Sequence, residues 1–190
     1  MADPTTLYLI RHGEIDRPPV AQFDDAVLTE EGREQIHDLA LRWTHPVPDL
    51  VYCSRLPRSV ETASLLAAVW RRPTQTVREL KEWAATDGNV RQETYLEWER
   101  RCWADFDHHN DEGESLHHAT DRIVDMLTKI AGDHAGRPIA VSGHAILFAL
   151  FAAAVRGGHA TEASKNRIGF GHYAIVESHS GFRIARDFGP

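Results

Sequence analysis

An apolar run near the start of the chain ends abruptly in charged residues, and this junction most constrains the fold. Residues 7–10 are hydrophobic and are followed directly by Arg11, His12 and Gly13. A short apolar run is typical of a strand buried in a sheet, and the glycine marks a sharp exit from it. In open α/β sheets the ligand crevice lies at the carboxyl ends of the central strands. The junction therefore predicts a central strand that presents Arg11 and His12 to a ligand.

Strand-like and helix-like segments alternate along the rest of the chain. Capping residues or a leading proline indicate the helix starts, and apolar residues three or four apart indicate the helix bodies. Besides the strand at 7–11, we expect strands over 49–54, 76–80 and 138–142, helices over 29–43, 57–67, 115–136 and 145–155, and a hairpin of 173–177 with 182–186. This alternation predicts a three-layer α/β/α sandwich, with helices on both faces of a mostly parallel central sheet.

Length and composition favour one domain. The chain has 190 residues, of which 42% are hydrophobic and 26% charged, as in ordinary globular proteins. We therefore expect a single domain over 1–190. The segment at about 83–112 mixes charges with Trp83, Trp98 and Trp103 and has no clean period. We interpret it as an insertion with some helix that forms a wall over the substrate site, with its tryptophans used for packing.

Charge and hydropathy argue against several classes of protein. The formal net charge of -7 argues against broad nucleic-acid binding, although a few arginines in one pocket still suit an anionic ligand. No apolar run approaches the ~20 residues of a membrane span, and the first six residues lack the basic start and apolar stretch of a signal peptide. We expect a cytoplasmic protein that binds neither membrane nor nucleic acid.

The cysteines and clustered histidines do not form a metal motif. Cys53 and Cys102 are the two cysteines and have no CxxC spacing, so neither a disulfide framework nor a cysteine-rich zinc site is indicated. Histidine pairs occur at 108–109 and 117–118, but adjacent imidazoles rarely point at one centre. We interpret these histidines as solvated surface residues and expect no metal and no cofactor.

Three later segments supply residues suited to phosphate chemistry. Arg58 follows Pro57 and is expected in the first turn of a helix, where it and Arg11 would offer planar guanidinium groups to phosphoryl oxygens. Glu82 provides a carboxyl group after the third expected strand, and His144 follows the next one. Two histidines, two arginines and a glutamate are groups that phosphoryl transfer through a nucleophile can use.

In order along the chain, these motifs resemble those of the histidine phosphatase superfamily, the phosphoglycerate mutase-like proteins. The resemblance covers nearly the whole chain. It rests on Arg11-His12-Gly13-Glu14, Leu28-Thr29-Glu30-Glu31-Gly32, Ser54 with Arg58 and Thr62, Glu82, Gly113-Glu114-Ser115 and Ser142-Gly143-His144. It implies the phosphoglycerate mutase-like α/β/α fold.

The resemblance also implies a role for each candidate catalytic residue. His12 is the implied nucleophile and would carry a transient phosphohistidine, while Arg11 and Arg58 would bind the phosphoryl oxygens. His144 corresponds to the second histidine of the family's pocket and would donate a hydrogen bond to an equatorial oxygen. Glu82 matches the family's acid, which protonates the leaving alkoxide and then activates water.

Other residues are expected to support these groups. Ser54 and Thr62 are expected to hold the catalytic side chains in place, and the amide of Ala145 would bind the phosphate at the start of a helix. Glu79 is the nearest rival to Glu82 as the acid. The loop after the first strand is a natural place for substrate contacts, and we expect Gln22 to make one.

Two departures from the family pattern affect these expectations. Pro18 stands where family members commonly have an asparagine that contacts phosphate, so the phosphate contacts of this loop are open. Residues 142–145 read Ser-Gly-His-Ala where many relatives have serine, histidine and glycine in succession. The histidine is retained, but the backbone around it can be placed differently.

The leading hypothesis is a metal-independent phosphomonoesterase that acts on a small phosphorylated metabolite through a phosphohistidine. Two alternatives remain: a phosphoglycerate-type mutase, and a regulatory protein that binds phosphate on the same fold without turnover. Mutases of this family are usually longer, which favours hydrolysis. The expected partners are a small phosphorylated substrate and, as an open option, a second copy of the chain in a homodimer.

Overall fold

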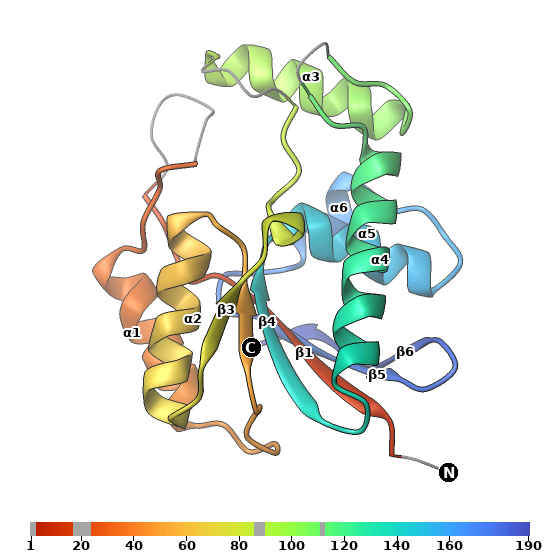
Figure 1. The fold of residues 1–190 in the computed structure, drawn as a ribbon. Helices are drawn as coiled ribbons and strands as arrows, with labels where there is room; N and C mark the ends of the chain where they lie inside the picture. Colours follow the sequence, from red (N-terminus) through yellow and green to blue (C-terminus); the bar gives the residue numbers. More distant parts are fainter. Residues whose placement is uncertain (1–2, 17–23, 86–89, 111–112) are drawn as a thin grey trace.

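The computed structural model describes residues 3–16, 24–85, 90–110 and 113–190, and these build a six-stranded sheet covered by helices (Figure 1). The strands are β1 (Thr5–Arg11), β2 (Val51–Cys53), β3 (Thr74–Thr76), β4 (Pro138–Gly143), β5 (Tyr173–Ser178) and β6 (Phe182–Gly189). The helices are α1 (Glu30–Leu41), α2 (Pro57–Trp70), the 3-10 turn η1 (Arg78–Leu80), α3 (Gln92–Ala104), α4 (Leu116–Asp133), α5 (Ala145–Val155) and α6 (Glu162–Asn166).

The sheet has the strand order β3-β2-β4-β1-β5-β6. Strands β3, β2, β4 and β1 run parallel to one another, β5 is antiparallel to β1, and β6 is antiparallel to β5. The prediction of a mostly parallel sheet is therefore confirmed, and so is the hairpin at the end of the chain. The carboxyl ends of the four parallel strands lie together at the edge nearest α3, at the top of Figure 1.

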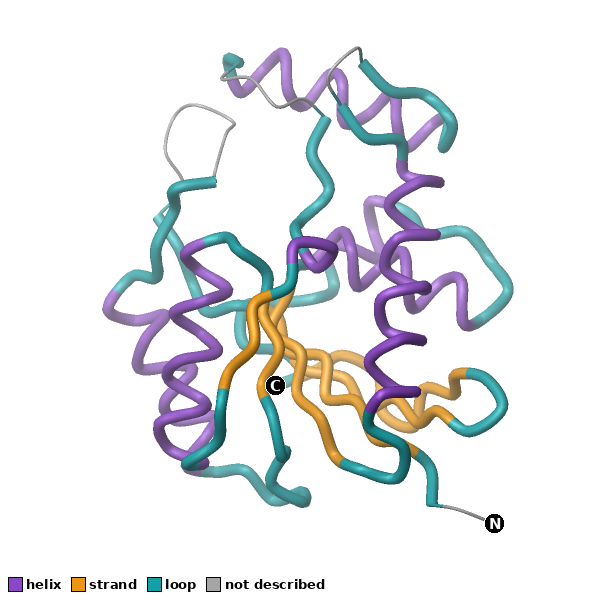
Figure 2. The backbone as a smooth tube through the Cα atoms, viewed as in Figure 1, coloured by secondary structure: helices purple, strands orange, loops and turns teal. Residues whose placement is uncertain are grey.

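Helices cover both faces of this sheet, as the alternation of elements predicts. Helices α1 and α2 lie on one face, and α4 and α5 lie on the other (Figures 1 and 2). Along β1, Leu7 and Leu9 pack into the cluster that includes α4 and α5, while Tyr8 and Ile10 pack into the cluster that includes α1 and α2. Successive side chains of a strand point to opposite faces, so a strand between two helical layers must be apolar throughout.

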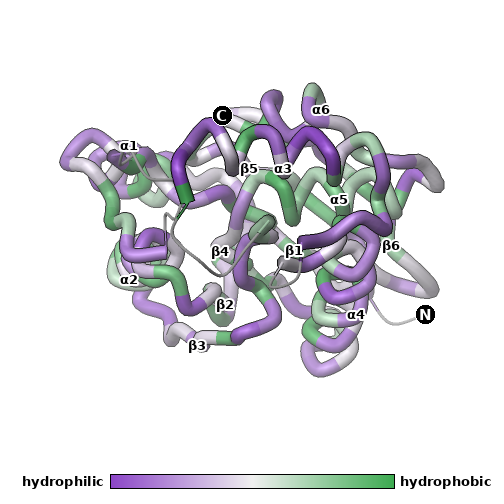
Figure 3. Tube along the Cα trace, turned by 90° about the horizontal axis from the view of Figure 1, so that it is seen from above, coloured by the Kyte–Doolittle hydropathy of each residue, from purple (hydrophilic) through white to green (hydrophobic). Residues whose placement is uncertain are grey.

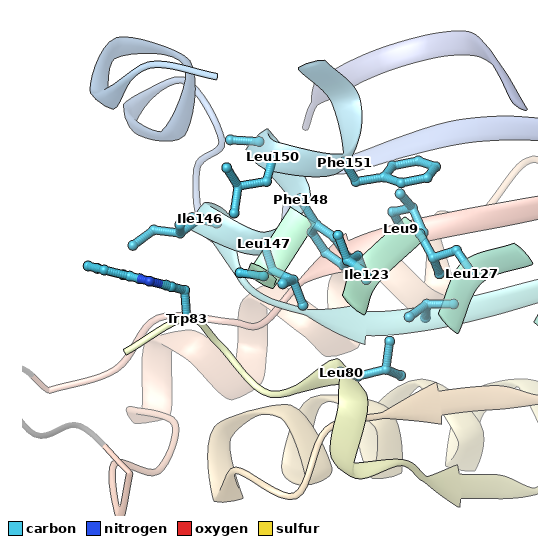
Figure 4. Packing of buried hydrophobic residues seen from close by; sticks show 14 of the residues in the cluster. Leu9, Leu80, Trp83, Ile123, Leu127, Ile146, Leu147, Phe148, Leu150 and Phe151 are labelled. Carbon is cyan, nitrogen blue, oxygen red and sulfur yellow. The ribbon is translucent and has the colours of Figure 1, made fainter. Parts of the chain in front are cut away.

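Helix α5 is the most hydrophobic element. It begins just after the carboxyl end of β4. Its residues are green almost throughout in Figure 3, and it contacts α4, α6 and β6. Figure 4 shows side chains of this helix, including Leu147, Phe148 and Phe151, packed with Leu9, Ile123 and Leu127. A helix that is apolar on all sides is stable only when it is buried on all sides. No helix among the described residues is long and apolar enough to cross a bilayer.

Local signals for helix starts are confirmed at three sites. Thr29 caps α1 by accepting a hydrogen bond from the Gly32 amide at 2.9 Å, and Ser115 caps α4 by accepting from the His118 amide at 3.1 Å. Pro57 is the first residue of α2, where its missing N–H costs nothing. These predictions succeed because capping involves residues only three positions apart.

One expected strand requires correction, and one helix was not expected. The strand expected at 76–80 is wrong in position: β3 is Thr74–Thr76 and the chain then turns into η1. Parallel pairing with β2 decides this register, and the apolar character of Val77 and Leu80 reflects packing against the core near α4 and α5 instead. Helix α6 was not predicted, although Thr161 and Ser164 form a capping box that starts it.

The described part of the insertion expected at about 83–112 includes helix α3, which crosses above the sheet in Figure 1 and is largely hydrophilic in Figure 3. Trp83 is buried in the core and lies near Ile146 and Leu147 in Figure 4. Trp98 and Trp103 pack against the same cluster. The interpretation that these tryptophans are used for packing is confirmed.

Gly13, which follows His12 just after the end of β1, is expected not to tolerate a side chain. A Cβ atom there would lie 2.5 Å from the Gly32 carbonyl oxygen and 2.9 Å from Cγ1 of Ile36, and the first of these is backbone that cannot rotate away. We expect Gly13→Ala to lower the free energy of unfolding by about 1–3 kcal/mol, the usual cost of overpacking.

Urea unfolding of Gly13→Ala and of Gly132→Ala tests this expectation. Gly132 is exposed near the end of α4, where an added Cβ meets no atom within 4 Å. Alanine there should leave the protein as stable as the wild type or up to about 1 kcal/mol more stable, because it favours the helix. Equal stability of the two variants would contradict the close approach of α1 to the end of β1.

Candidate active site

Strand register brings three of the site segments together. Arg11 on β1 is paired with Gly143 on β4, and Cys53 on β2 is paired with Ser142 on β4. The residues that leave the sheet immediately afterwards are therefore His12, His144 and Ser54. Parallel pairing thus places these side chains at one edge although they are far apart in the sequence.

The His12 imidazole is held in a defined orientation. The residue is 4% exposed, and its Nδ1 lies 2.8 Å from the carbonyl oxygen of Gly13. A carbonyl oxygen can only accept, so Nδ1 carries the ring proton and the lone pair lies on Nε2. The Gly13 amide in turn donates to Oγ1 of Thr62 at 3.2 Å, and Thr62 Oγ1 donates to the Arg58 carbonyl at 2.8 Å. Thr62 therefore ties the loop that follows β1 to α2.

His144 lies beside His12, with 5.3 Å between the ring centroids, and is fully buried. Its Nε2 is 2.8 Å from Oγ of Ser54, and that oxygen also accepts from the Leu56 amide at 3.3 Å. The Ser54 hydroxyl has a proton to donate to Nε2, and with this direction of the hydrogen bond the ring proton of His144 lies on Nδ1. Burial lowers the pKa of His144 well below its ordinary value, and the positive charge of Arg58 lowers it further. His144 is therefore a neutral hydrogen-bond donor.

Stability should depend on pH through His144. Its pKa is lower in the folded protein than in the unfolded chain, so below about pH 6.5 protons bind the unfolded chain preferentially. The contribution of neutral His144 is complete above pH 6.5 and is lost as the pH falls towards the folded-state pKa. We expect this group alone to lower the free energy of unfolding by up to about 1.4 kcal/mol for each pH unit below 6.5.

Denaturant unfolding at several pH values between 8 and 5 measures this dependence. The free energy of unfolding of the wild type should fall more steeply towards acid than that of His144→Gln, which has no imidazole to protonate in the unfolded state. If the free energy of unfolding of the two proteins fell in parallel with pH, His144 would have the same pKa in the folded and unfolded states, and the prediction would be wrong.

Two arginines lie at the same edge. Arg58, in the first turn of α2, is 5% exposed. Burial lowers its pKa, while the negative charge of Glu82 opposes this. The Arg11 guanidinium lies 4.0 Å from the centre of the Phe170 ring and donates to the Ile168 carbonyl. A flat ring and a carbonyl fix the plane of this guanidinium, as bidentate recognition of an oxyanion requires.

Glu82 is positioned by the start of α5. Its Oε1 accepts from the amides of Trp83 at 2.9 Å and Leu147 at 3.0 Å, and its Oε2 accepts from the amide of Ile146 at 3.1 Å. Burial raises the pKa of the carboxyl group, and these three hydrogen bonds and Arg58 partly offset the rise. Because these effects on its pKa oppose each other, the carboxyl group is suited both to donate and to accept a proton.

Most of the predicted site residues line one cavity of about 290 Å³. Arg11, His12, Arg58, Glu82 and Ala145 all contribute to its wall. His144 is not part of this wall but lies next to it, with its ring centroid 5.3 Å from that of His12. Gln22 and Pro18, which also bear on the sequence-based expectations, fall outside the residues that the structure describes. Glu79, the rival acid, is exposed and lines a different hollow beside Arg122, so the structure does not bring it into this group.

The cavity also contains residues that sequence reasoning missed. Tyr95 and Glu99 reach it from α3, Lys165 from α6, and Phe170 from the loop before β5. Glu99 and Cys102 form the buried face of α3. A glutamate on the buried face of an otherwise polar helix was the available signal, but it could be recognised only once the helix was placed. Nothing in the sequence marked Lys165 or Phe170.

The clustered histidines do not gather around a common point. In the described ranges, no three histidine, cysteine or acidic side chains are arranged to hold a metal ion. His109, His117 and His118 are exposed, and Nδ1 of His117 pairs with Asp107 at 2.9 Å. These three are surface residues, as the sequence indicated, while His108 is half-buried.

Comparison with known proteins identifies the architecture. The model of the histidine phosphatase superfamily (branch 1) matches residues 7–187. No curated protein matches the sequence. Among solved structures, YhfR of Bacillus stearothermophilus is 22% identical, with 96% of each chain covered and a TM-score of 0.79.

Two further structures share the fold. A phosphoserine phosphatase of Entamoeba histolytica is 18% identical, covers 97% of this chain and 96% of its own, and has a TM-score of 0.82. A mycobacterial glucosyl-3-phosphoglycerate phosphatase is 20% identical, covers 96% of this chain and 98% of its own, and has a TM-score of 0.76. At these identities the likeness establishes the fold, and the α/β/α prediction is confirmed.

Proposed function

Since the chain belongs to branch 1 of the histidine phosphatase superfamily, we propose that it hydrolyses the phosphate monoester of a small metabolite through a phosphohistidine on His12, without a metal ion. One observation carries this proposal: the His12 imidazole has its proton held on Nδ1, and it borders the same cavity as Arg58 and Glu82. A neutral imidazole with its lone pair on Nε2 is a competent nucleophile towards phosphorus.

In the first step, Nε2 of His12 attacks phosphorus and the bond to the leaving oxygen breaks. Glu82 in its acid form gives its proton to that oxygen, so the product leaves as an alcohol. Arg11 and Arg58 bind the equatorial oxygens, whose charge they neutralise, and Nδ1–H of His144 donates to one of them. Nδ1 of His144 is buried and has no hydrogen-bond partner among the described residues, which is consistent with a donor reserved for the substrate.

In the second step, water replaces the histidine on phosphorus. Glu82, now a carboxylate, takes a proton from the water as its oxygen attacks phosphorus, and the bond to Nε2 of His12 breaks. Inorganic phosphate leaves, Glu82 is again an acid, and the imidazole is neutral. Because Glu82 must pass a proton both ways, a raised pKa brings it nearer to working pH than an exposed glutamate.

Steady release of phosphate from 4-nitrophenyl phosphate in the presence of EDTA tests the proposal. We expect many turnovers per protein molecule and no loss of rate on chelation. A folded protein that binds phosphate without releasing it from any ester would instead be a regulatory binding protein. Transfer of the phosphoryl group to a second phosphoester, with little release to water, would identify a mutase.

A further inference from the structure

A buried ion pair that joins α6 to α3 also borders the cavity. Nζ of Lys165 on α6 lies 2.5 Å from Oε1 of Glu99 on α3, and the same oxygen accepts from Nε1 of Trp103 at 3.1 Å. The side chains of Lys165 and Glu99 are only 18% and 8% exposed. Both residues line the cavity that holds His12 and Arg58. The mechanism proposed above makes no use of them.

This pair has unused hydrogen-bonding capacity. Oε2 of Glu99 accepts no hydrogen bond from the described residues, and the Lys165 ammonium has three protons of which one is directed at Glu99. Gln92, Asn166 and Tyr95 line the same cavity. Burial raises the pKa of Tyr95, so its hydroxyl remains protonated. The wall therefore offers both donors and acceptors.

The pair of Lys165 and Glu99 differs in net charge from the two arginines that line the same cavity. Arg11 and Arg58 add two positive charges where the phosphate would lie, whereas the charges of Lys165 and Glu99 cancel. A second anionic group on the substrate would therefore gain little here. An aliphatic group would leave the buried pair without water and without new partners, which is costly.

We propose that Glu99 and Lys165 form a subsite for the uncharged, hydroxyl-bearing part of the substrate, so that this enzyme acts on sugar or polyol phosphates. This inference rests on the proposed phosphatase function and names its substrate class. Neighbouring hydroxyls can donate to Oε2 of Glu99 and accept from Lys165 while the ion pair stays intact. The ammonium and carboxylate of an amino acid could use both charges only by separating this buried pair.

Three esters distinguish these substrate classes: myo-inositol 1-phosphate, cyclohexyl phosphate and O-phosphoserine. The first two have the same six-membered carbon ring, with and without hydroxyls. We expect kcat/KM for the inositol ester to exceed that for the cyclohexyl ester by about 10- to 100-fold, the effect of one or two hydrogen bonds to charged groups. Equal values for the two esters, or a preference for phosphoserine, would overturn the proposal.

Two matched variants test whether Glu99 is responsible for the preference for the inositol ester. Glu99→Gln should lower the ratio of kcat/KM between the inositol and cyclohexyl esters about 10-fold or more, because the carboxylate acceptor is lost. Glu97→Gln makes the same chemical change on the same helix, in an exposed pair with Arg101, and should keep the wild-type ratio. If Glu99 only joins α3 to α6, Glu99→Gln will reduce thermal stability and both rates together, with the ratio unchanged, which overturns the subsite.

Binding to His12→Ala, measured by calorimetry, separates this inference from the proposed function. That variant has no nucleophile, so the inositol and cyclohexyl esters remain intact during titration. A lower Kd for the inositol ester supports the subsite even if no ester is hydrolysed by the wild type. Equal Kd values alongside normal hydrolysis of 4-nitrophenyl phosphate would reject the subsite and leave the phosphatase function standing.

Discussion

Replacement of His12 by alanine should reduce kcat/KM for every phosphate ester by about 10⁴-fold or more, as loss of a catalytic nucleophile does. The reason is geometric: Nε2 of His12 is the nitrogen left with a lone pair when Nδ1 donates to the Gly13 carbonyl. Water would then have to attack the ester directly, with only Arg11, Arg58 and His144 to stabilise the charge. Initial rates on 4-nitrophenyl phosphate and on an alkyl phosphate measure the loss.

A labelled phosphoenzyme gives a second readout of the same variant. Rapid quenching of wild type with radiolabelled substrate should trap a phosphoryl group that is labile in acid and stable in base, as expected for a phosphorus–nitrogen bond. His12→Ala should trap none, while His109→Ala, which removes an exposed imidazole, should trap as much as wild type. A label of the same lability on His12→Ala would mean that another residue is the nucleophile.

Replacement of Glu82 by glutamine should discriminate between leaving groups. An alkoxide leaves poorly unless it is protonated, so we expect alkyl phosphates to slow by about 10²-fold or more. 4-Nitrophenolate leaves readily without a proton, so its ester should lose much less. Glutamine preserves the size of the side chain but replaces one oxygen by an amide nitrogen, so one hydrogen bond at the start of α5 is lost, and thermal unfolding must be followed in parallel.

The pH profile and a control variant sharpen this test. Since the pKa of Glu82 is raised, the wild type should lose activity on alkyl phosphates as the pH rises through that pKa, and Glu82→Gln should lack this limb. Glu79→Gln alters a neighbouring carboxylate that lines a different hollow and should behave as wild type. An equal loss on both esters in Glu82→Gln would remove Glu82 as the leaving-group acid.

Much of the fold could be predicted because the sequence patterns that indicate its strands and helices involve residues close together in the chain. The apolar run before Arg11 becomes β1, Thr29 and Ser115 cap helices, and the apolar segment after His144 becomes a helix buried on all sides. Each of these depends on residues within a few positions of one another. The error at β3 has the opposite origin, because hydrogen bonds with β2, far away in the sequence, decide its register.

The residues of the candidate site also fall into two groups: those that the sequence predicted and those that only the structure revealed. His12 and Arg58 were identified from residue type and position, Glu82 from the family resemblance, and the structure places all three at one cavity. Glu99 and Lys165 were not identified, because a glutamate on one helix and a lysine on another carry no meaning until the two helices meet.

Residue chemistry along the chain was sufficient to predict an α/β/α architecture and a phosphate-directed group of side chains at the ends of its strands. The distances between those side chains, the tautomer of His12 and the polar wall around Lys165 came from contacts between remote segments. The physical reason is that helix caps and strand character depend on neighbouring residues. A cavity instead exists only where packing of the whole molecule leaves space, and burial then determines which buried groups are charged and which hydrogen bonds remain available.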